Sequence, residues 1–134
     1  LMLAARRGHT DTVKALLAAP GLDVNAAKGL GMTALIVAAL GGHTETVTAL
    51  LAAPGIDVNA VDDSGLTALM RAALGGYTET VTALLAAPGL EVNVAGLNGS
   101  TALAIAEGKG HVGVASLLGA RRAQDLMTFT DPKG

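Results

Sequence analysis

The chain repeats itself with a period of 34 residues. Pro20, Pro54 and Pro88 are 34 residues apart, and the triplet Thr-Ala-Leu recurs at 33–35, 67–69 and 101–103. A fixed period of roughly 20 to 50 residues is typical of arrays in which one supersecondary unit packs on copies of itself. A chain of 134 residues has room for about four such units. Arrays of this kind present extended surfaces, and their usual role is to hold another macromolecule.

The composition argues against several classes of function. The net charge of −2 gives no electrostatic case for a nucleic-acid or membrane partner. The chain contains no cysteine, which excludes disulfides and thiolate metal sites and fits a reducing compartment. No signal peptide or transmembrane segment is visible, since the longest apolar stretch, 32–40, is far shorter than the ~18–20 residues that span a bilayer. We therefore expect a cytoplasmic (intracellular) protein.

The segment 33–66 illustrates how one unit is built. Thr33 is a good N-cap for a short helix that ends at Gly41-Gly42. Thr44 is expected to cap a second helix in the same way, with an apolar stripe that includes Leu50. Applied to every copy, this pattern predicts helices near 1–7, 10–19, 33–41, 44–53, 67–75, 78–87, 101–108 and 111–121.

The connection that follows the second helix is rich in turn residues. In Pro54-Gly55, proline presets the first central position of a type II turn and glycine supplies the positive φ of the second. The later segment Asp62-Asp63-Ser64-Gly65 is also typical of a turn. The predicted unit is therefore helix, tight turn, helix and a long hairpin-like loop.

One copy of the unit shows a longer pattern of residues. It consists of Asp62, Gly65, Thr67-Ala68-Leu69, Ala72-Ala73 and Gly76-Tyr77, followed by Val81, Leu84-Leu85 and Glu91-Val92-Asn93. This unit resembles the ankyrin repeat, whose pattern is roughly Asp-x-x-Gly-x-Thr-Pro-Leu-His-x-Ala-Ala-x-x-Gly-His. The resemblance covers about residues 1–119 and implies an all-α, ankyrin-type helix-turn-helix solenoid of about four repeats with hairpin-like loops. It also implies a protein–protein interaction module.

The chain departs from the ankyrin pattern in its first helix, in its loop and in its last unit. Thr-Ala-Leu replaces Thr-Pro-Leu, and the loop is one residue longer than usual, which explains the period of 34. In the last unit Glu107 replaces an alanine, as expected for a C-terminal cap with a wet outer face. We expect one array over residues 1–124 followed by a tail. The repeats are 1–26, 27–60, 61–94 and 95–124, and the tail is 125–134.

Several motifs suggest chemistry, but in each case a structural interpretation is favoured. Gly108 to Gly113 spells G-x-G-x-x-G, yet it follows a predicted helix and not the strand that a dinucleotide site needs. His9, His43 and His111 recur at the repeat period or a multiple of it. Rings one repeat apart cannot reach one metal ion, so turn histidines bonded to backbone are expected.

The polar dipeptides are likewise assigned to turns. Asn98-Gly99-Ser100 matches the glycosylation sequon, but Asn-Gly is also a strong tight-turn signal. The pair Asp62-Asp63 is expected in a solvated turn, because no neighbouring group provides a catalytic constellation. We therefore expect no enzyme activity, no cofactor and no metal.

The partner surface is predicted from positions that differ between otherwise similar repeats. In ankyrin-like proteins the loop tips and the exposed face of the first helix line the concave binding surface. Two alternatives stay open: free drift without a partner, and a structural or engineered scaffold without a natural ligand. The resemblance places the candidate binding residues at Arg6, Arg7, Met32, Leu40, Asp63, Leu66, Arg71, Leu74, Leu97, Ser100 and Lys109.

The N-terminal face is a second candidate surface. Leu1 aligns with Leu35, so the first unit lacks its threonine cap and the loop before it. Leu3 and Val13 are expected to be partly uncovered there, and uncovered apolar patches mark contact sites. This pattern predicts weak self-association through the N-terminal face.

Overall fold

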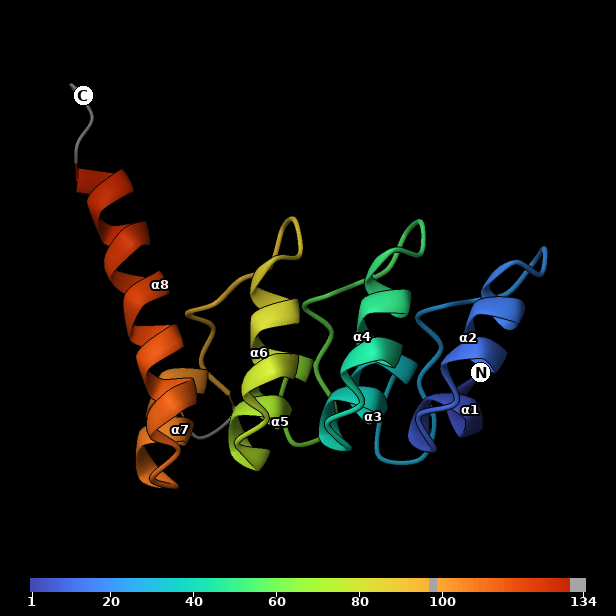
Figure 1. Ribbon diagram of the computed structural model, residues 1–134, viewed down its shortest axis with the longest axis horizontal. Coiled ribbons are helices and arrows are strands. Elements are labelled where there is room, and N and C mark those ends of the chain that lie inside the picture. Colours follow the sequence, from blue (N-terminus) through green and yellow to red (C-terminus); the bar gives the residue numbers. More distant parts are fainter. Residues whose placement is uncertain (97–98, 131–134) are drawn as a thin grey trace.

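The computed structural model describes the backbone of residues 1–96 and 99–130, and the side chains of 1–96 and 99–124. These residues form a row of helix pairs in which each pair packs on the next (Figure 1). No β-strand is present in the described part of the chain, where the pairing is limited to isolated bridges in the loops. The helices are α1 (Met2–Arg6), α2 (Thr10–Leu17), α3 (Ala34–Leu40), α4 (Thr44–Leu51), α5 (Ala68–Gly75), α6 (Thr78–Leu85), α7 (Ala102–Gly108) and α8 (Val112–Thr130).

Threonine caps set the start of the first helix in three repeats. The Oγ1 atoms of Thr33, Thr67 and Thr101 each accept a hydrogen bond at 3.2 Å from the backbone N–H three residues later. This is the N-cap geometry expected from the sequence, and it satisfies one of the free donors at the helix start. The predicted caps of the first helices are therefore confirmed.

The predicted cap of the second helix is wrong. The N-cap of α4 is His43, which makes no side-chain cap bond, and Thr44 is already inside the helix. The Thr44 hydroxyl instead lies 2.8 Å from the Thr80 hydroxyl of the next repeat. The N–H of Thr44 donates to the Gly42 carbonyl at 3.0 Å, so the tight turn leads directly into the first residue of α4.

The connection after α4 has the geometry predicted for a type II turn. Gly55 has a φ of +78°, and the N–H of Ile56 donates to the Ala53 carbonyl at 3.2 Å. The proline before this glycine fixes the preceding φ. This turn directs the chain from the end of the second helix into the hairpin-like loop.

The core is a continuous strip of aliphatic side chains. Leu50 of α4 and Leu84 of α6 are fully buried, as expected for the apolar stripe of the second helices. Ala38, Ala39 and the equivalent Ala72 and Ala73 have no exposed surface, so α3 and α5 can approach closely. Because each helix has only five to eight residues except α8, packing between repeats stabilises them.

Asparagines in the loops connect neighbouring repeats. The Nδ2 of Asn59 donates to the Gly89 carbonyl at 2.8 Å, and its Oδ1 accepts from the N–H of Glu91 at 2.8 Å. Asn25 makes the same two bonds to Gly55 and Asp57 of its neighbour. One side chain in each of these loops therefore fixes the position of the next loop.

The last helix is longer than the sequence pattern predicted. Helix α8 continues to Thr130 and extends beyond the ends of the other second helices (Figure 1). Arg122 and Ala123 occupy the positions of Pro88 and Gly89, so the turn that ends α6 is missing here. The Nη1 of Arg121 donates to the Leu85 carbonyl at 2.7 Å, which holds α8 to α6. The division into an array and a tail at 125–134 stays a prediction.

Candidate protein-binding surface

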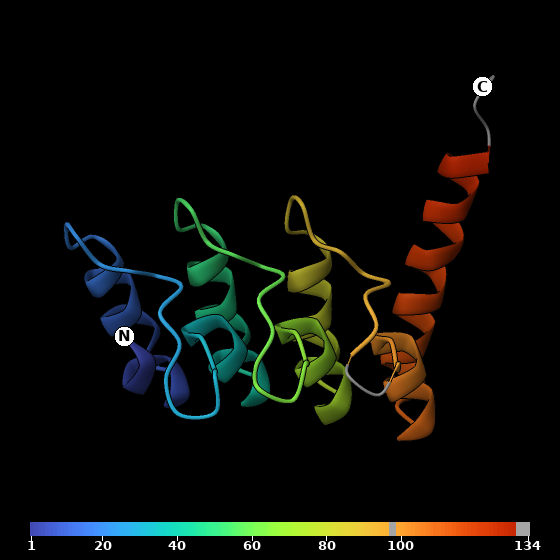
Figure 2. The same ribbon diagram turned by 180° about the vertical axis from the view of Figure 1, so that it is seen from behind.

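Three loops share one equivalent backbone hydrogen bond that closes the loop. Lys28 and Met32 exchange backbone hydrogen bonds at 3.1 Å. In the next two repeats, the N–H of Asp62 donates to the Leu66 carbonyl and that of Gly96 donates to the Ser100 carbonyl. Figure 2 shows the loops running in front of the helices on this side of the array. The array therefore presents a row of similarly built loops along one side.

Apolar side chains stand out at two of these tips. Leu30 is 69% exposed and Val61 is 50% exposed. The N–H of Asp63 donates to the Leu30 carbonyl at 2.9 Å, so adjacent tips are joined by backbone. Two exposed aliphatic side chains are thus held on connected loops.

Asp62 is buried, which overturns the expectation of a solvated acidic turn. Its Oδ2 accepts from Nε and Nη2 of Arg71 at 2.8 and 2.6 Å, and the two side chains are 1% and 15% exposed. Its Oδ1 accepts from the backbone N–H groups of Ser64 and Leu66 at 2.9 and 3.1 Å. Through these bonds the Asp62 carboxylate closes the loop and anchors the Arg71 side chain. Asp63, the other member of the pair, is exposed.

The predicted binding residues separate into two groups at opposite ends of the first helices. One group lies at the loop tips and helix starts, and the other lies at the helix ends. The first helices have five to eight residues and are therefore about 7–12 Å long, so both groups border the same row of helices. The first group contains Met32, Asp63, Leu66, Arg71 and Ser100, and the second contains Arg6, Arg7, Leu40, Leu74 and Lys109.

The members of these groups differ in how free they are to meet a partner. Asp63 and Lys109 are exposed, and Leu40 is 40% exposed. Arg71 is paired with Asp62, so its guanidinium is held by the loop and is less available to a partner. Met32, Leu66, Leu74 and Ser100 are half-buried, Arg6 and Arg7 are exposed, and Leu97 lies outside the described residues.

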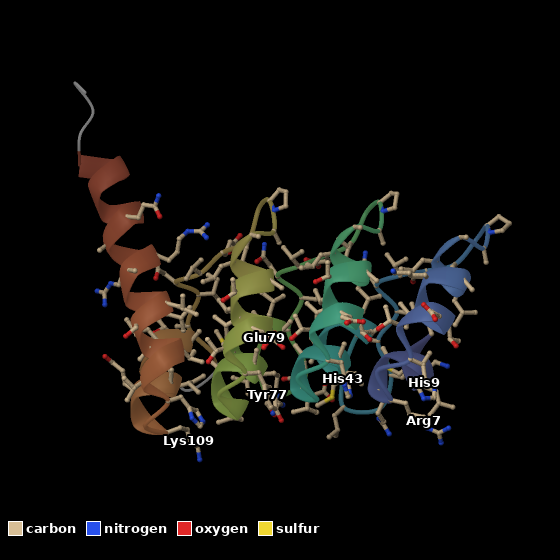
Figure 3. The ribbon with its side chains drawn as sticks, in the orientation of Figure 1. Arg7, His9, His43, Tyr77, Glu79 and Lys109 are labelled. Carbon is tan, nitrogen blue, oxygen red and sulfur yellow. The ribbon has the colours of Figure 1, made fainter. Side chains whose placement is uncertain are left out.

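Two of the three turn histidines, His43 and His111, bond to backbone as expected. The Nε2 of His43 lies 3.0 Å from the Arg6 carbonyl oxygen, and that of His111 lies 3.1 Å from the Leu74 carbonyl oxygen. Figure 3 shows His9, His43 and Tyr77 at corresponding places along the row of repeats. The rings of His43 and His111 therefore join successive repeats. In the described part of the chain, no group of three or more His, Cys, Asp or Glu residues is placed to hold a metal ion.

The remaining motifs have structural positions. Gly108 ends α7 and Gly113 lies in the first turn of α8, so the G-x-G-x-x-G segment joins two helices and lacks the preceding strand of a dinucleotide site. Gly99 has the positive φ of a tight turn, +81°, whereas Asn98 lies outside the described residues. No helix of the described chain is long and apolar enough to cross a membrane.

Two prominent residues of this surface were not among the predicted binding residues. Leu30 and Val61 belong to the variable loop tips, but the sequence gives no direct signal of exposure. One signal could have identified Leu30: it stands between Gly29 and Gly31, which have φ values of +61° and +77°. A large apolar residue between two turn glycines is placed at a tip, away from the core.

The comparison with protein families agrees with this geometry. A family model of ankyrin repeats in three copies matches residues 1–96, and a second, overlapping match covers residues 54–129. No curated protein matches the chain.

Proposed function

The chain belongs to the ankyrin repeat family, and on that premise we propose that it binds a partner protein through its loop tips and the concave face of its first helices. Ankyrin repeats are generally protein–protein interaction modules and are typically non-enzymatic. The observation that carries the proposal is the exposure of Leu30 and Val61 on loop tips joined by the bond from Asp63.

The chemistry of the surface favours an apolar contact bordered by charged side chains. Leu30, Val61 and Leu40 supply exposed aliphatic surface. The exposed charges of the predicted set are one anion, Asp63, and the cations Arg6, Arg7 and Lys109. Such a surface is poor in the Trp and Tyr residues that, together with Arg, usually dominate binding energy. We expect a partner with an apolar patch and an affinity at the modest end of protein complexes.

A matched pair of substitutions tests the proposal. Val61→Ser removes an apolar side chain from a loop tip, and Val112→Ser removes the same side chain from the start of α8, where it is 75% exposed. Partners are captured on each immobilised variant from a lysate, identified by mass spectrometry and then titrated in purified form. Binding that is weakened by Val61→Ser and kept by Val112→Ser supports the proposal. A partner that responds equally to both variants, or to neither, contradicts it.

Self-association through the N-terminal face is a second proposal. Leu3 is 57% exposed and lines an open cavity of about 260 Å³ with Leu1, Arg7, His9 and Leu16. Val13, which was expected to be partly uncovered as well, is fully buried. The contact therefore depends on α1 and on the face of α2 that carries Leu16, and Leu3→Lys is its most direct test.

A further inference from the structure

Two histidine rings pack against a glycine of the repeat before their own. A Cβ atom added to Gly8 would come within 2.6 Å of the His43 ring, and one added to Gly76 would come within 2.6 Å of the His111 ring. These glycines have φ values of +68° and +71°. Both the backbone conformation and the available space therefore favour glycine under each ring.

The same two rings are bonded to the backbone of the preceding repeat. Nε2 of His43 lies 3.0 Å from the Arg6 carbonyl oxygen, and Nε2 of His111 lies 3.1 Å from the Leu74 carbonyl oxygen. Because a carbonyl oxygen only accepts, Nε2 donates in both bonds. Arg6 and Leu74 lie in the last turns of α1 and α5, where a helix has no partner for its own carbonyl groups. Each histidine thus joins two repeats at two points.

Tyr77 keeps the ring contact but not the hydrogen bond. A Cβ atom added to Gly42 would come within 2.7 Å of the Tyr77 ring, so the ring packs as the histidines do. In the described chain, no hydrogen bond joins the Tyr77 side chain to the equivalent carbonyl, that of Leu40. This junction, between the helix pairs α3–α4 and α5–α6, is therefore held by the ring at one point only.

The positions of the ring atoms explain the missing bond. A Cβ atom on Gly41 would meet Nε2 and Cδ2 of the His43 ring. At the equivalent Gly75 it would meet Cε2 and Cδ2 of the Tyr77 ring. A carbon atom of Tyr77 therefore occupies the place of the nitrogen that donates in His43.

The space beside the ring is also larger at the Tyr77 junction. Equivalent residues, a glycine, three threonines, a glutamate and the ring, line an open cavity at both junctions. Its volume is about 190 Å³ beside His43 and about 420 Å³ beside Tyr77. A wider space between the same positions leaves fewer van der Waals contacts across the junction.

The contact between the second helices does not differ in this way. The hydroxyls of Thr10 and Thr46 lie 2.9 Å apart, and those of Thr44 and Thr80 lie 2.8 Å apart. One threonine pair thus connects neighbouring second helices at each of the two junctions. The difference between the junctions lies at the ring.

We propose that the junction between α3–α4 and α5–α6 is a joint at which the array bends, and that Tyr77 makes it so. The loop tips stay connected there by the bond from the Asp63 N–H to the Leu30 carbonyl, at 2.9 Å. The movement is therefore largest where α3 and α5 end, at Leu40 and Leu74. A partner that binds one curvature better shifts the joint toward it. The inference goes beyond the proposed function and is tested without a partner.

Spin labels on the second helices measure this movement in the complete chain. Because the chain contains no cysteine, Thr48→Cys and Thr82→Cys place one label on each side of the joint. Both threonines are exposed and occupy equivalent positions in α4 and α6. Electron paramagnetic resonance then gives the distribution of distances between the labels with Tyr77 present, with Tyr77→His and with Tyr77→Phe.

Tyr77→His should narrow the distribution, because the substituted ring can donate to the Leu40 carbonyl. Tyr77→Phe is the matched control and should leave the width unchanged, since the Tyr77 hydroxyl has no hydrogen-bond partner in the described chain. Hydrogen exchange of the Gly42 amide, which lies under the ring, should slow about two- to tenfold with Tyr77→His, the factor that one hydrogen bond provides. Tyr77→Phe should not slow it.

The reverse substitution should create a second joint. His43→Tyr removes the bond to the Arg6 carbonyl, so the junction between α1–α2 and α3–α4 should loosen. Labels at Lys14→Cys and Thr48→Cys, which are equivalent exposed positions of α2 and α4, report on this junction. Their distance distribution should broaden with His43→Tyr.

Two outcomes would overturn the inference. One is a distribution across the joint that is as broad with Tyr77→His as with Tyr77. The other is equal narrowing by Tyr77→His and Tyr77→Phe, which would show that the donating nitrogen has no role. If Tyr77→His fails to fold, an unchanged distribution with His43→Tyr overturns the inference by itself.

Discussion

Nη2 of Arg71 lies 2.6 Å from Oδ2 of Asp62, and the ion pair joins the first turn of α5 to the loop that precedes it. The equivalent positions hold Lys28 and Val37 in the repeat before, and Gly96 and Ile105 in the repeat after. The pair is therefore particular to one repeat. The residues equivalent to 62 and 71 both differ between repeats, and in this repeat they form an ion pair. Part of the difference between repeats on this face is therefore explained by a contact within the protein and not by a partner.

Removing the cation of this pair should destabilise the protein strongly. Arg71→Val leaves the Asp62 carboxylate, which is 1% exposed, without its charged partner, and breaking a buried pair in this way typically costs about 3–5 kcal/mol. The double variant Asp62→Ala/Arg71→Val should lose less than the sum of the single losses. Urea unfolding of the three variants measures this coupling. Additive losses would show that the pair contributes no interaction energy.

The apolar stripe of the second helices should carry much of the stability. Leu50 and Leu84 are fully buried, so Leu50→Ala or Leu84→Ala should each cost about 2–5 kcal/mol, the range for emptying a buried leucine site. Leu30→Ala, at an exposed loop tip, is the control and should cost less than about 0.5 kcal/mol. Equal, negligible changes in the denaturation midpoints of the three variants would contradict the assigned core.

The threonine contact between α4 and α6 should be measurable. Thr80 is completely buried and its hydroxyl lies 2.8 Å from that of Thr44. Thr44→Val removes this partner and should cost about 1–3 kcal/mol, the usual penalty for an unsatisfied buried hydroxyl. Thr82→Val is the matched control, since the Thr82 hydroxyl bonds to the Thr78 carbonyl at an exposed site. Thermal unfolding that ranks Thr82→Val as the more damaging change would refute this interpretation.

Neither the removal of metal ions nor the addition of a nucleotide should change the thermal stability of the protein. A ligand that binds only the folded state stabilises it by an amount that grows with ligand concentration. EDTA should leave Tm unchanged, and millimolar NAD or ATP should not raise it. Stabilisation of about 1 kcal/mol or more by either nucleotide would contradict this expectation and would indicate a phosphate-binding site at Gly108–Gly113.

The sequence predicts most of the fold because the period and the turn residues are local signals. The Thr33 cap and the Pro54-Gly55 turn depend on neighbours within three residues, and both have the predicted geometry. The role of Thr44 could not be predicted in this way, because its hydroxyl bonds to a residue 36 positions away. The predicted end of α8 near residue 121 is wrong because the polar run that begins at Arg121 indicates a cap, whereas the Pro-Gly pair that ends α6 has no counterpart at Arg122 and Ala123.

The candidate surface was harder to predict because it also depends on contacts between residues that are far apart in the sequence. Variation between repeats identifies positions that packing leaves free, but it does not separate exposed residues from those engaged in internal pairs. Arg71 varies and is paired, whereas Leu30 varies and is 69% exposed. Only the packing of adjacent loops distinguishes the two.

Hydrogen exchange of the chain with and without its purified partner tests the central claim, that the loop side is the binding surface. Backbone amides at the loop tips 28–32 and 61–66, and in the first turns of α3 and α5, should exchange more slowly in the complex. The exposed turns of α4 and α6 should be unchanged. Protection confined to α4 and α6, with the loop tips unaffected, would contradict the account.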